Sequence, residues 1–151
     1  MFYFVHVLAG AVIAKYFPNF FIIILLGLIL HFLIDAIPHR DSLFTKEVFK
    51  KSYKIQVNDK AVLLEISDII IAILLIFYIY FKFNNSLMLF GIFFSLLPDI
   101  LRLGYFTKLR DNKFFTKFML FHLRIQKEIS WIPGLLTQLI VSLIFIKLLY
   151  N

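Results

Sequence analysis

The sequence contains no cysteine, which excludes disulfide bonds, thiolate nucleophiles and metal sites built with cysteine. It also lacks the G-x-S-x-G pattern that presents a nucleophilic serine on a sharp turn, which argues against that form of hydrolase chemistry. Only five glycines stand against 20 phenylalanines, a composition that is not typical of a disordered chain. Histidine, aspartate and glutamate are therefore the residues that remain for a metal site.

Charged side chains are scarce: 17% of the residues are charged and 62% are hydrophobic. A soluble globular domain is about 45–50% apolar and about 25% charged. A chain of 151 residues has too little interior to bury such an excess of apolar side chains. We therefore predict an all-α protein embedded in lipid, a polytopic transmembrane helical bundle.

The apolar runs divide this single membrane domain, residues 1–151, into five predicted membrane helices. Pro18 and Asn19 end the first run, Pro38 ends the second, and Asn84 and Asn85 separate the third from the fourth. The expected helices are residues 2–17, 20–37, 61–81, 87–103 and 131–150. The first is short for a bilayer, which needs about 20 residues, so we expect it to lie shallow or to be shielded by its neighbours.

Most of the 16 lysines and arginines follow the second and fourth predicted helices, in residues 39–60 and 102–128. These two stretches lie on the same side of the membrane, and the positive-inside rule makes that side cytoplasmic. We expect an integral protein of the cell (inner) membrane, with the N-terminus cytoplasmic and the C-terminus outside. The net charge of +7 indicates anionic membrane lipids as partners, and no nucleic acid is predicted.

The second basic stretch has the pattern of an amphipathic helix over residues 113–128. Apolar residues recur there at helical spacing, and basic residues fall largely on the other side. The apolar positions are Phe114, Phe118, Phe121, Ile125 and Ile129, and the basic ones are Lys113, Lys117, Arg124 and Lys127. We predict a helix in the cytoplasmic interface of the membrane, the alternative being an ordinary loop helix packed on the bundle.

On this topology every histidine, and every acidic residue within a span, lies in one leaflet. The residues are His6, His31, Asp35, His39, Glu65, Asp68, Asp99 and His122, and Asp41 follows the second helix on the same side. Burying charge in hydrocarbon costs several kcal/mol unless the charge is paired or bound to metal, so such residues are candidates for function. His31 and Asp35 are also four residues apart, which places an imidazole and a carboxylate on one helix face as a two-point metal chelate.

Each of these residues also has a purely structural explanation. Asp99 can pair with Arg102 one turn later, and Glu65 or Asp68 can complement a helix N-terminus. His39 can be a solvated loop residue, as can Asp41. The confinement of the whole set to one side of a small bundle nevertheless favours a shared metal or catalytic site.

A weak internal repeat joins the two predicted hairpins. Glycine, a polar residue and aspartate follow one another at intervals of four residues in Gly27, His31 and Asp35, and again in Gly91, Ser95 and Asp99. Matches of this length also arise by chance in apolar spans. A duplicated hairpin would bring its two aspartates together.

The segment from Gly27 to Asp41, with His6 upstream and Leu97-Pro98-Asp99 downstream, resembles the membrane-bound metal-dependent hydrolases of the YdjM-like type. Those proteins are small and polytopic, with an early histidine, a Pro-Asp or Asp-Pro-His segment at a helix end, and later acids and histidines. Their usual Pro-Asp-x-Asp-His order is rearranged here into Asp35-Ala-Ile-Pro-His-Arg-Asp41. The resemblance implies a membrane-embedded metal-dependent hydrolase.

The leading hypothesis is therefore a hydrolase that acts at the cytoplasmic headgroup level on a lipid-like or phosphoester substrate, an amphiphilic small molecule. Glu65 or Asp68 would act as the catalytic base. The predicted metal ligands are His6, His31, Asp35, His39, Asp41, Asp99 and His122. Imidazole and carboxylate ligands without thiolate suit one or two divalent ions, Zn²⁺, Mn²⁺ or Fe²⁺.

Two alternatives belong to other classes of protein. A transporter or ion-handling protein would use the same cluster, but few polar residues continue into the opposite leaflet, where the first four helices carry Lys15 and Lys82. A non-catalytic scaffold would use the cluster as a structural metal site or salt-bridge knot. Either type, or the hydrolase, is compatible with a homodimer.

Overall fold

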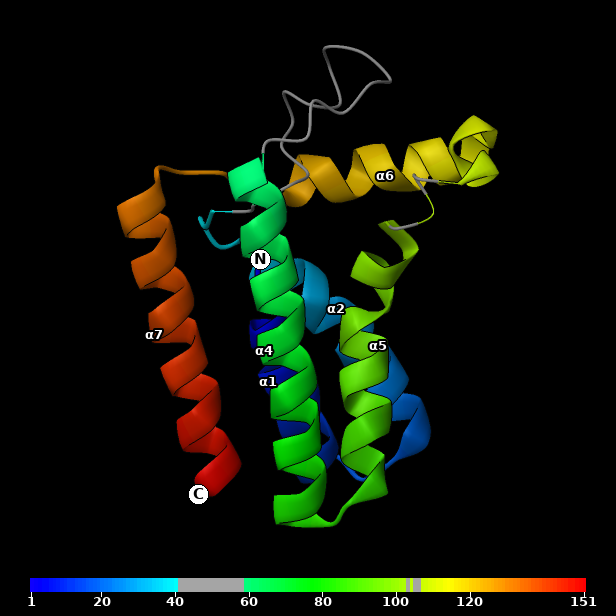
Figure 1. Ribbon diagram of the computed structural model, residues 1–151. Coiled ribbons are helices and arrows are strands. Elements are labelled where there is room, and N and C mark those ends of the chain that lie inside the picture. The colour runs from blue at the N-terminus through cyan, green and yellow to red at the C-terminus, as the bar shows by residue number, and fades with distance from the viewer. Residues whose placement is uncertain (41–58, 103, 105–106) are drawn as a thin grey trace.

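The computed structural model describes residues 1–40, 59–102, 104 and 107–151. Within these ranges the chain forms six α-helices and one short 3-10 helix, so the all-α prediction is confirmed (Figure 1). The helices are α1 (Tyr3–Tyr16), α2 (Phe20–Ala36), α4 (Asp59–Phe83), α5 (Ser86–Arg102), η2 (Lys108–Asp111), α6 (Lys113–Ile125) and α7 (Trp131–Tyr150). Asp41, one of the predicted ligands, lies outside the described residues.

Helix α1 occupies the centre of the bundle and is buried along nearly its whole length, from Tyr3 to Ala14. It packs against α2, α4, α5 and α7. Fourteen residues span only about 21 Å, less than the roughly 30 Å of a bilayer's hydrocarbon core. The four surrounding helices shield α1 on all sides, which is the second of the two arrangements expected for so short an apolar helix.

The start of α1 is buried, and side chains from other helices satisfy its first amides. The first N–H groups of a helix have no partner within it. Here the Phe2 amide donates to Gln138 Oε1 of α7 at 2.9 Å. The Tyr3 and Phe4 amides donate to the two carboxylate oxygens of Asp68 in α4, at 2.6 and 3.3 Å.

The crossing of α1 and α5 requires two glycines. A Cβ added to Gly10 would lie 2.6 Å from the Ile92 Cα, and a Cβ on Gly91 would collide with the backbone of Gly10. Small residues of this kind let two helix backbones approach closely. Helices α1 and α5 run in opposite directions (Figure 1). His6, before Gly10, therefore reaches the same level as Asp99, after Gly91, and their side chains come within 3.7 Å.

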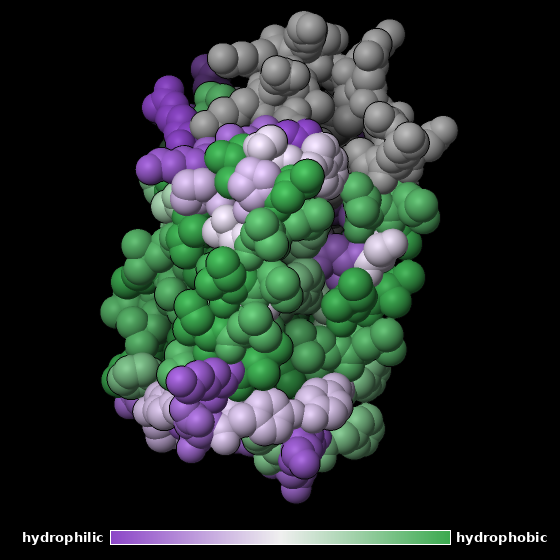
Figure 2. All heavy atoms as spheres, turned by 90° about the vertical axis from the view of Figure 1, so that its left-hand side faces the viewer, coloured by the Kyte–Doolittle hydropathy of each residue, from purple (hydrophilic) through white to green (hydrophobic). Residues whose placement is uncertain are grey.

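The outer surface of the bundle is apolar. Two helices, Leu63–Phe83 and Trp131–Tyr150, are long and apolar enough to cross a membrane. In the space-filling view their hydrophobic side chains form a belt between two polar ends (Figure 2). The other apolar helices are shorter, Tyr3–Tyr16 and Phe20–Ala36 among them, so the crossing of a membrane by five helices stays a prediction.

Helix α6 lies across one end of the bundle, the end at which the N-terminus is found, while the C-terminus is at the opposite end (Figure 1). The Asn112 side chain caps α6 by accepting hydrogen bonds from the Phe114 and Phe115 amides, at 2.8 and 3.3 Å. One face of α6 is buried, with Met119 and His122, whereas Phe114 is 82% exposed.

The predicted helix over residues 113–128 ends earlier, at Ile125. After Gln126 the chain is extended and pairs with the segment that follows α2. The His39 amide donates to the Lys127 carbonyl, and the Ile129 amide donates to the His39 carbonyl, both at 3.0 Å. These two bonds hold the backbone of residues 127–129 outside the helix and tie the end of α6 to the end of α2.

Candidate metal centre

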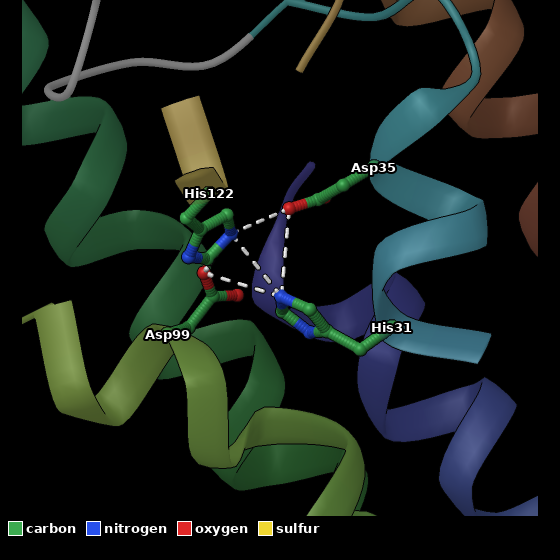
Figure 3. A group of neighbouring side chains, drawn as sticks. All are labelled: His31, Asp35, Asp99 and His122. Atoms are coloured by element: carbon green, nitrogen blue, oxygen red, sulfur yellow. Dashed lines mark hydrogen bonds and ion pairs between the residues drawn. The ribbon is translucent and has the colours of Figure 1, made fainter. Parts of the chain in front are cut away.

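Four buried side chains from three helices converge below α6. They are His31 and Asp35 of α2, Asp99 of α5 and His122 of α6 (Figure 3). One ligand atom from each lies within 4.8 Å of the others, and all four residues have no exposed surface. The i, i+4 spacing of His31 and Asp35 places both on one face of α2, as the sequence predicted, and in the structure this face meets α5 and α6.

The distances within this group, from 2.8 to 4.0 Å, lie around the spacing of ligands on a small cation, and the shortest is a hydrogen bond between His122 Nε2 and Asp35 Oδ2. The Nε2 atom of His122 lies 2.8 Å from Asp35 Oδ2, and the Nε2 of His31 lies 3.5 Å from the same oxygen. The two Nε2 atoms are 3.2 Å apart. Metal–ligand bonds of about 2.0–2.2 Å in tetrahedral geometry separate neighbouring ligand atoms by about 3.3–3.6 Å.

Asp99 completes the group from the opposite side. Its Oδ1 lies 4.0 Å from the His31 Nε2 and 3.8 Å from the His122 Nε2. The same oxygen forms an ion pair with the buried Arg102, at 3.0 Å. The pairing of Asp99 with Arg102 is thus observed, together with its place among the histidines.

The protonation of the His31 ring is fixed by a backbone contact. Its Nδ1 lies 2.7 Å from the Ser95 carbonyl oxygen, which only accepts, so Nδ1 carries the proton and donates. In the neutral ring Nε2 then presents a lone pair toward Asp35, Asp99 and His122. A backbone carbonyl that holds the outer nitrogen in this way is the usual arrangement for a histidine that ligates metal.

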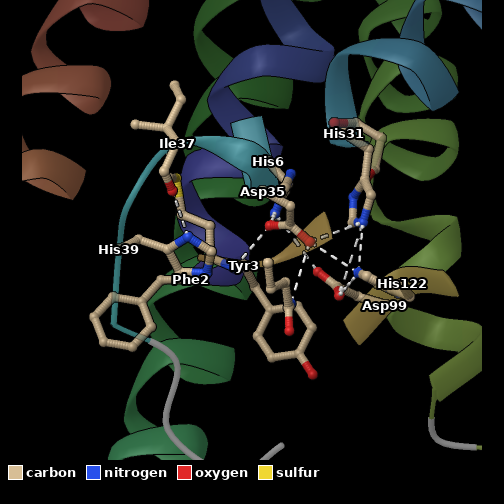
Figure 4. Close-up of polar contacts among 12 residues, drawn as sticks. Phe2, Tyr3, His6, His31, Asp35, Ile37, His39, Asp99 and His122 are labelled. Carbon is tan, nitrogen blue, oxygen red and sulfur yellow. Dashed lines mark hydrogen bonds and ion pairs between the residues drawn. The ribbon is translucent and has the colours of Figure 1, made fainter. Parts of the chain in front are cut away.

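A third histidine lies directly beside this group. The His6 ring of α1 stacks on the His31 ring with centroids 4.3 Å apart. Its Nε2 lies 3.3 Å from Asp35 Oδ1 and 3.7 Å from Asp99 Oδ2, the carboxylate oxygens that face away from His122 (Figure 4). His6 has no exposed surface.

Asp35 is the most heavily contacted residue of the group. Its Oδ1 accepts a hydrogen bond from the Met1 ammonium at 2.8 Å. Its Oδ2 accepts one from the side-chain amide, Nε2, of Gln126 in the segment after α6, at 3.3 Å. Together with the histidines, these contacts fix the carboxylate plane and therefore the direction in which each oxygen points.

The predicted catalytic pair faces the start of α1. Glu65 accepts a hydrogen bond from the Tyr3 hydroxyl at 2.8 Å, and Asp68 accepts from the Tyr3 and Phe4 amides. Both acids are largely buried, with 7% and 4% of their surface exposed. The contacts of Asp68 are those of a helix cap supplied by a neighbouring helix, whereas Glu65 holds the Tyr3 side chain.

His39 lies apart from the four-residue group. Its Nδ1–H donates to the Ile37 carbonyl at 2.8 Å, and its backbone pairs with residues 127–129 (Figure 4). Its place is at the junction between the ends of α2 and α6. Of the seven predicted ligands, His6, His31, Asp35, Asp99 and His122 come together, His39 does not, and Asp41 is outside the described residues.

Several contacts that shape the site were not predicted from the sequence. Gln126 reaches Asp35, and the Ser95 backbone carbonyl orients His31. Gln138 of α7 accepts from the Phe2 amide and donates to the Arg40 carbonyl, at 3.0 Å. A buried glutamine in an otherwise apolar helix such as α7 is a usable signal, whereas no pattern in the sequence indicates a backbone carbonyl as a partner.

The donor set fits a divalent ion, because imidazole and carboxylate ligands converge at suitable separations and the second ring nitrogen of His31 is held by the protein. No family model, curated protein or solved structure matches this chain. The fold and the site together define an all-α protein with two helices suited to crossing a membrane and a buried histidine–aspartate group that can hold a metal ion.

Proposed function

We propose that this chain is a membrane-embedded, metal-dependent hydrolase whose metal centre consists of His31, Asp35, Asp99 and His122. The observation that carries the proposal is the orientation of His31. Its donated Nδ1–H leaves the Nε2 lone pair directed at two buried carboxylates and a second imidazole. Arg102 and the Met1 ammonium offset part of the negative charge of these carboxylates, and a cation between the ligand atoms would also satisfy the facing nitrogen lone pair, which is costly to bury without a partner.

The resemblance to the YdjM-like membrane hydrolases agrees with this chemistry. Ligands of nitrogen and oxygen without thiolate suit Zn²⁺, Mn²⁺ or Fe²⁺. A divalent ion bound there supplies an activated water molecule and polarises the bond to be cleaved. The chain itself supplies the rigid ligand frame, in which Ser95, Gln126 and Arg102 hold the ligands in place.

The position of the centre suggests the class of substrate. It lies at the end of the bundle that α6 covers, and basic residues gather along α6 and just after it, at Lys113, Lys117, Arg124 and Lys127. On the predicted topology this end is at the cytoplasmic headgroup level, with α6 in the interface. An amphiphilic substrate with an anionic headgroup, such as a phosphoester lipid, fits such a site because basic residues attract anionic headgroups.

The test is elemental analysis of the full chain, purified in detergent, beside Asp35→Asn and His122→Ala. We expect bound metal in the wild type and a loss of affinity greater than about 100-fold in both variants, since changes in supporting residues alone cost 10–100-fold. Ser142→Ala is the matched control, because that buried hydroxyl bonds to the Gln138 carbonyl within α7.

Hydrolysis of phosphoester and phospholipid substrates is then measured on the same samples. Activity that follows the metal content supports the hydrolase. Metal bound tightly without activity on any ester would identify a structural metal site instead. A wild-type chain that takes up neither Zn²⁺ nor Mn²⁺ nor Fe²⁺ would overturn the metal centre and leave the cluster as a salt-bridged knot.

A further inference from the structure

The two aspartates of the site present their oxygens to opposite sides. Oδ2 of Asp35 and Oδ1 of Asp99 face the Nε2 atoms of His31 and His122. The remaining oxygens, Oδ1 of Asp35 and Oδ2 of Asp99, face the Nε2 of His6 at 3.3 and 3.7 Å. Each carboxylate therefore lies between two groups of imidazole nitrogens.

The His6 Nε2 is directed at these two remaining oxygens but forms a hydrogen bond with neither of them. Neither of its ring nitrogens makes a hydrogen bond with any part of the chain that the structure describes, although the ring is fully buried. Buried polar side-chain atoms nearly always have a partner, so this arrangement calls for an explanation. The distances from its Nε2 to the two carboxylate oxygens, 3.3 and 3.7 Å, are close to the separation of two ligand atoms on one ion.

The Asp99 carboxylate, which faces His6, is likewise buried without a hydrogen bond among the described residues. Among the described residues, neither of its oxygens accepts a hydrogen bond, and the ion pair with Arg102 is made by Oδ1. Oδ2 is thus directed at His6 with a negative charge that has no hydrogen-bonded donor. An oxygen and an imidazole nitrogen that face each other in this way are held together well by a cation between them.

We infer that the protein holds a second divalent cation, bound by His6 Nε2, Asp35 Oδ1 and Asp99 Oδ2, beside the ion of the proposed centre. Asp35 and Asp99 bridge the two positions, each giving one oxygen to each ion. This inference rests on the proposed function, because the bridging carboxylates are ligands of the first ion. It assigns to His6 a place in a two-metal centre of the type that clamps both sides of a phosphoester during displacement.

Two contacts in the structure are compatible with this arrangement. Oδ1 of Asp35 also accepts from the Met1 ammonium at 2.8 Å, but a carboxylate oxygen has two lone pairs and can serve both. The stacking of the His6 ring on His31 at 4.3 Å sets the two imidazoles side by side, so that each can serve a different ion. The Gly10–Gly91 crossing brings the helices that carry His6 and Asp99 close enough for this.

The experiment counts metal ions in the full chain. Wild type, His6→Gln and His6→Ala are purified in detergent, loaded with Mn²⁺, freed of unbound metal and analysed for Mn²⁺ per chain and by electron paramagnetic resonance. His39→Gln is the matched control, a buried histidine at the same end of the bundle outside the four-residue group. Thermal unfolding of each variant verifies that it is folded.

We expect about two ions per wild-type chain with the spectrum of a coupled pair, and about one ion with an uncoupled spectrum in both His6 variants. One ion in the wild type and one in His6→Gln would overturn the second position while leaving the proposed function intact. Two ions in every sample would overturn the role of His6. Loss of all metal in a folded His6→Gln would show a single centre that includes His6, and no metal in the wild type would remove the proposed function as well.

Discussion

The Nδ1–H of His31 donates to the carbonyl oxygen of Ser95, 2.7 Å away, and thereby joins α2 to α5 at the level of the site. The contact uses the backbone of Ser95 and not its hydroxyl, which is buried and makes no hydrogen bond within the described residues. The two residues occupy equivalent positions in the repeat of glycine, polar residue and aspartate. The aspartates of that repeat, Asp35 and Asp99, do meet in one group.

Ser95→Ala is therefore expected to leave metal binding unchanged, because the acceptor for His31 is retained. Removing a buried hydroxyl that has no partner should leave the free energy of unfolding unchanged or raise it by up to about 1 kcal/mol. Metal content and thermal unfolding in detergent measure the two effects. A variant that folds normally but loses its metal would show that the Ser95 hydroxyl is itself a ligand.

A second prediction concerns Asp68, which stands in the sequence as a candidate base and in the structure as the cap of α1. Asp68→Ala should lower the free energy of unfolding by about 1–3 kcal/mol, because it leaves the buried Tyr3 amide and the partly buried Phe4 amide without this acceptor. Asp68→Asn keeps one acceptor oxygen and should cost less. Metal content should be normal in both variants.

The same pair of variants tests the catalytic role predicted for Asp68. Thermal unfolding and ester hydrolysis are measured side by side at a temperature at which all samples are folded. If Asp68→Asn unfolds like the wild type and has lost hydrolysis while keeping its metal, Asp68 acts in the reaction. If hydrolysis declines only as far as the folded fraction does, its role is to hold α1 in place.

The helices, and the end of the bundle at which the site lies, follow from local features of the sequence. Apolar runs bounded by Pro18, Asn84 and Pro38 locate helix ends, because proline and asparagine act within a few residues of their own position. The spacing of His31 and Asp35 puts both on one helix face whatever surrounds it. Antiparallel connections then bring Asp99 to the same level.

The choice among the residues at that level depends on how each helix is rotated, which tertiary packing decides. Asp68 and Asp99 lie at one end of the bundle, yet α4 directs Asp68 at the amides of α1 while α5 directs Asp99 at the histidines. His39 follows α2 at once, but two backbone bonds to residues 127–129 hold it at the α2–α6 junction. Such contacts between segments about 90 residues apart leave no periodic signal in the sequence.

The last prediction tests the membrane topology, and the absence of cysteine makes it practical because a single introduced cysteine is the only reactive thiol. Lys82 and Lys113 are exposed, and they lie at the last turn of α4 and the first turn of α6, at opposite ends of the bundle (Figure 1). A membrane-impermeant maleimide added to intact cells should label Lys82→Cys and leave Lys113→Cys unlabelled until the membrane is opened. The cysteine-free parent is the control for background labelling.

The reverse pattern would place α6 and the histidine–aspartate group on the outer side, so that the substrate would have to be sought there. Labelling of both positions from outside would contradict a bundle that spans the membrane between its two polar ends.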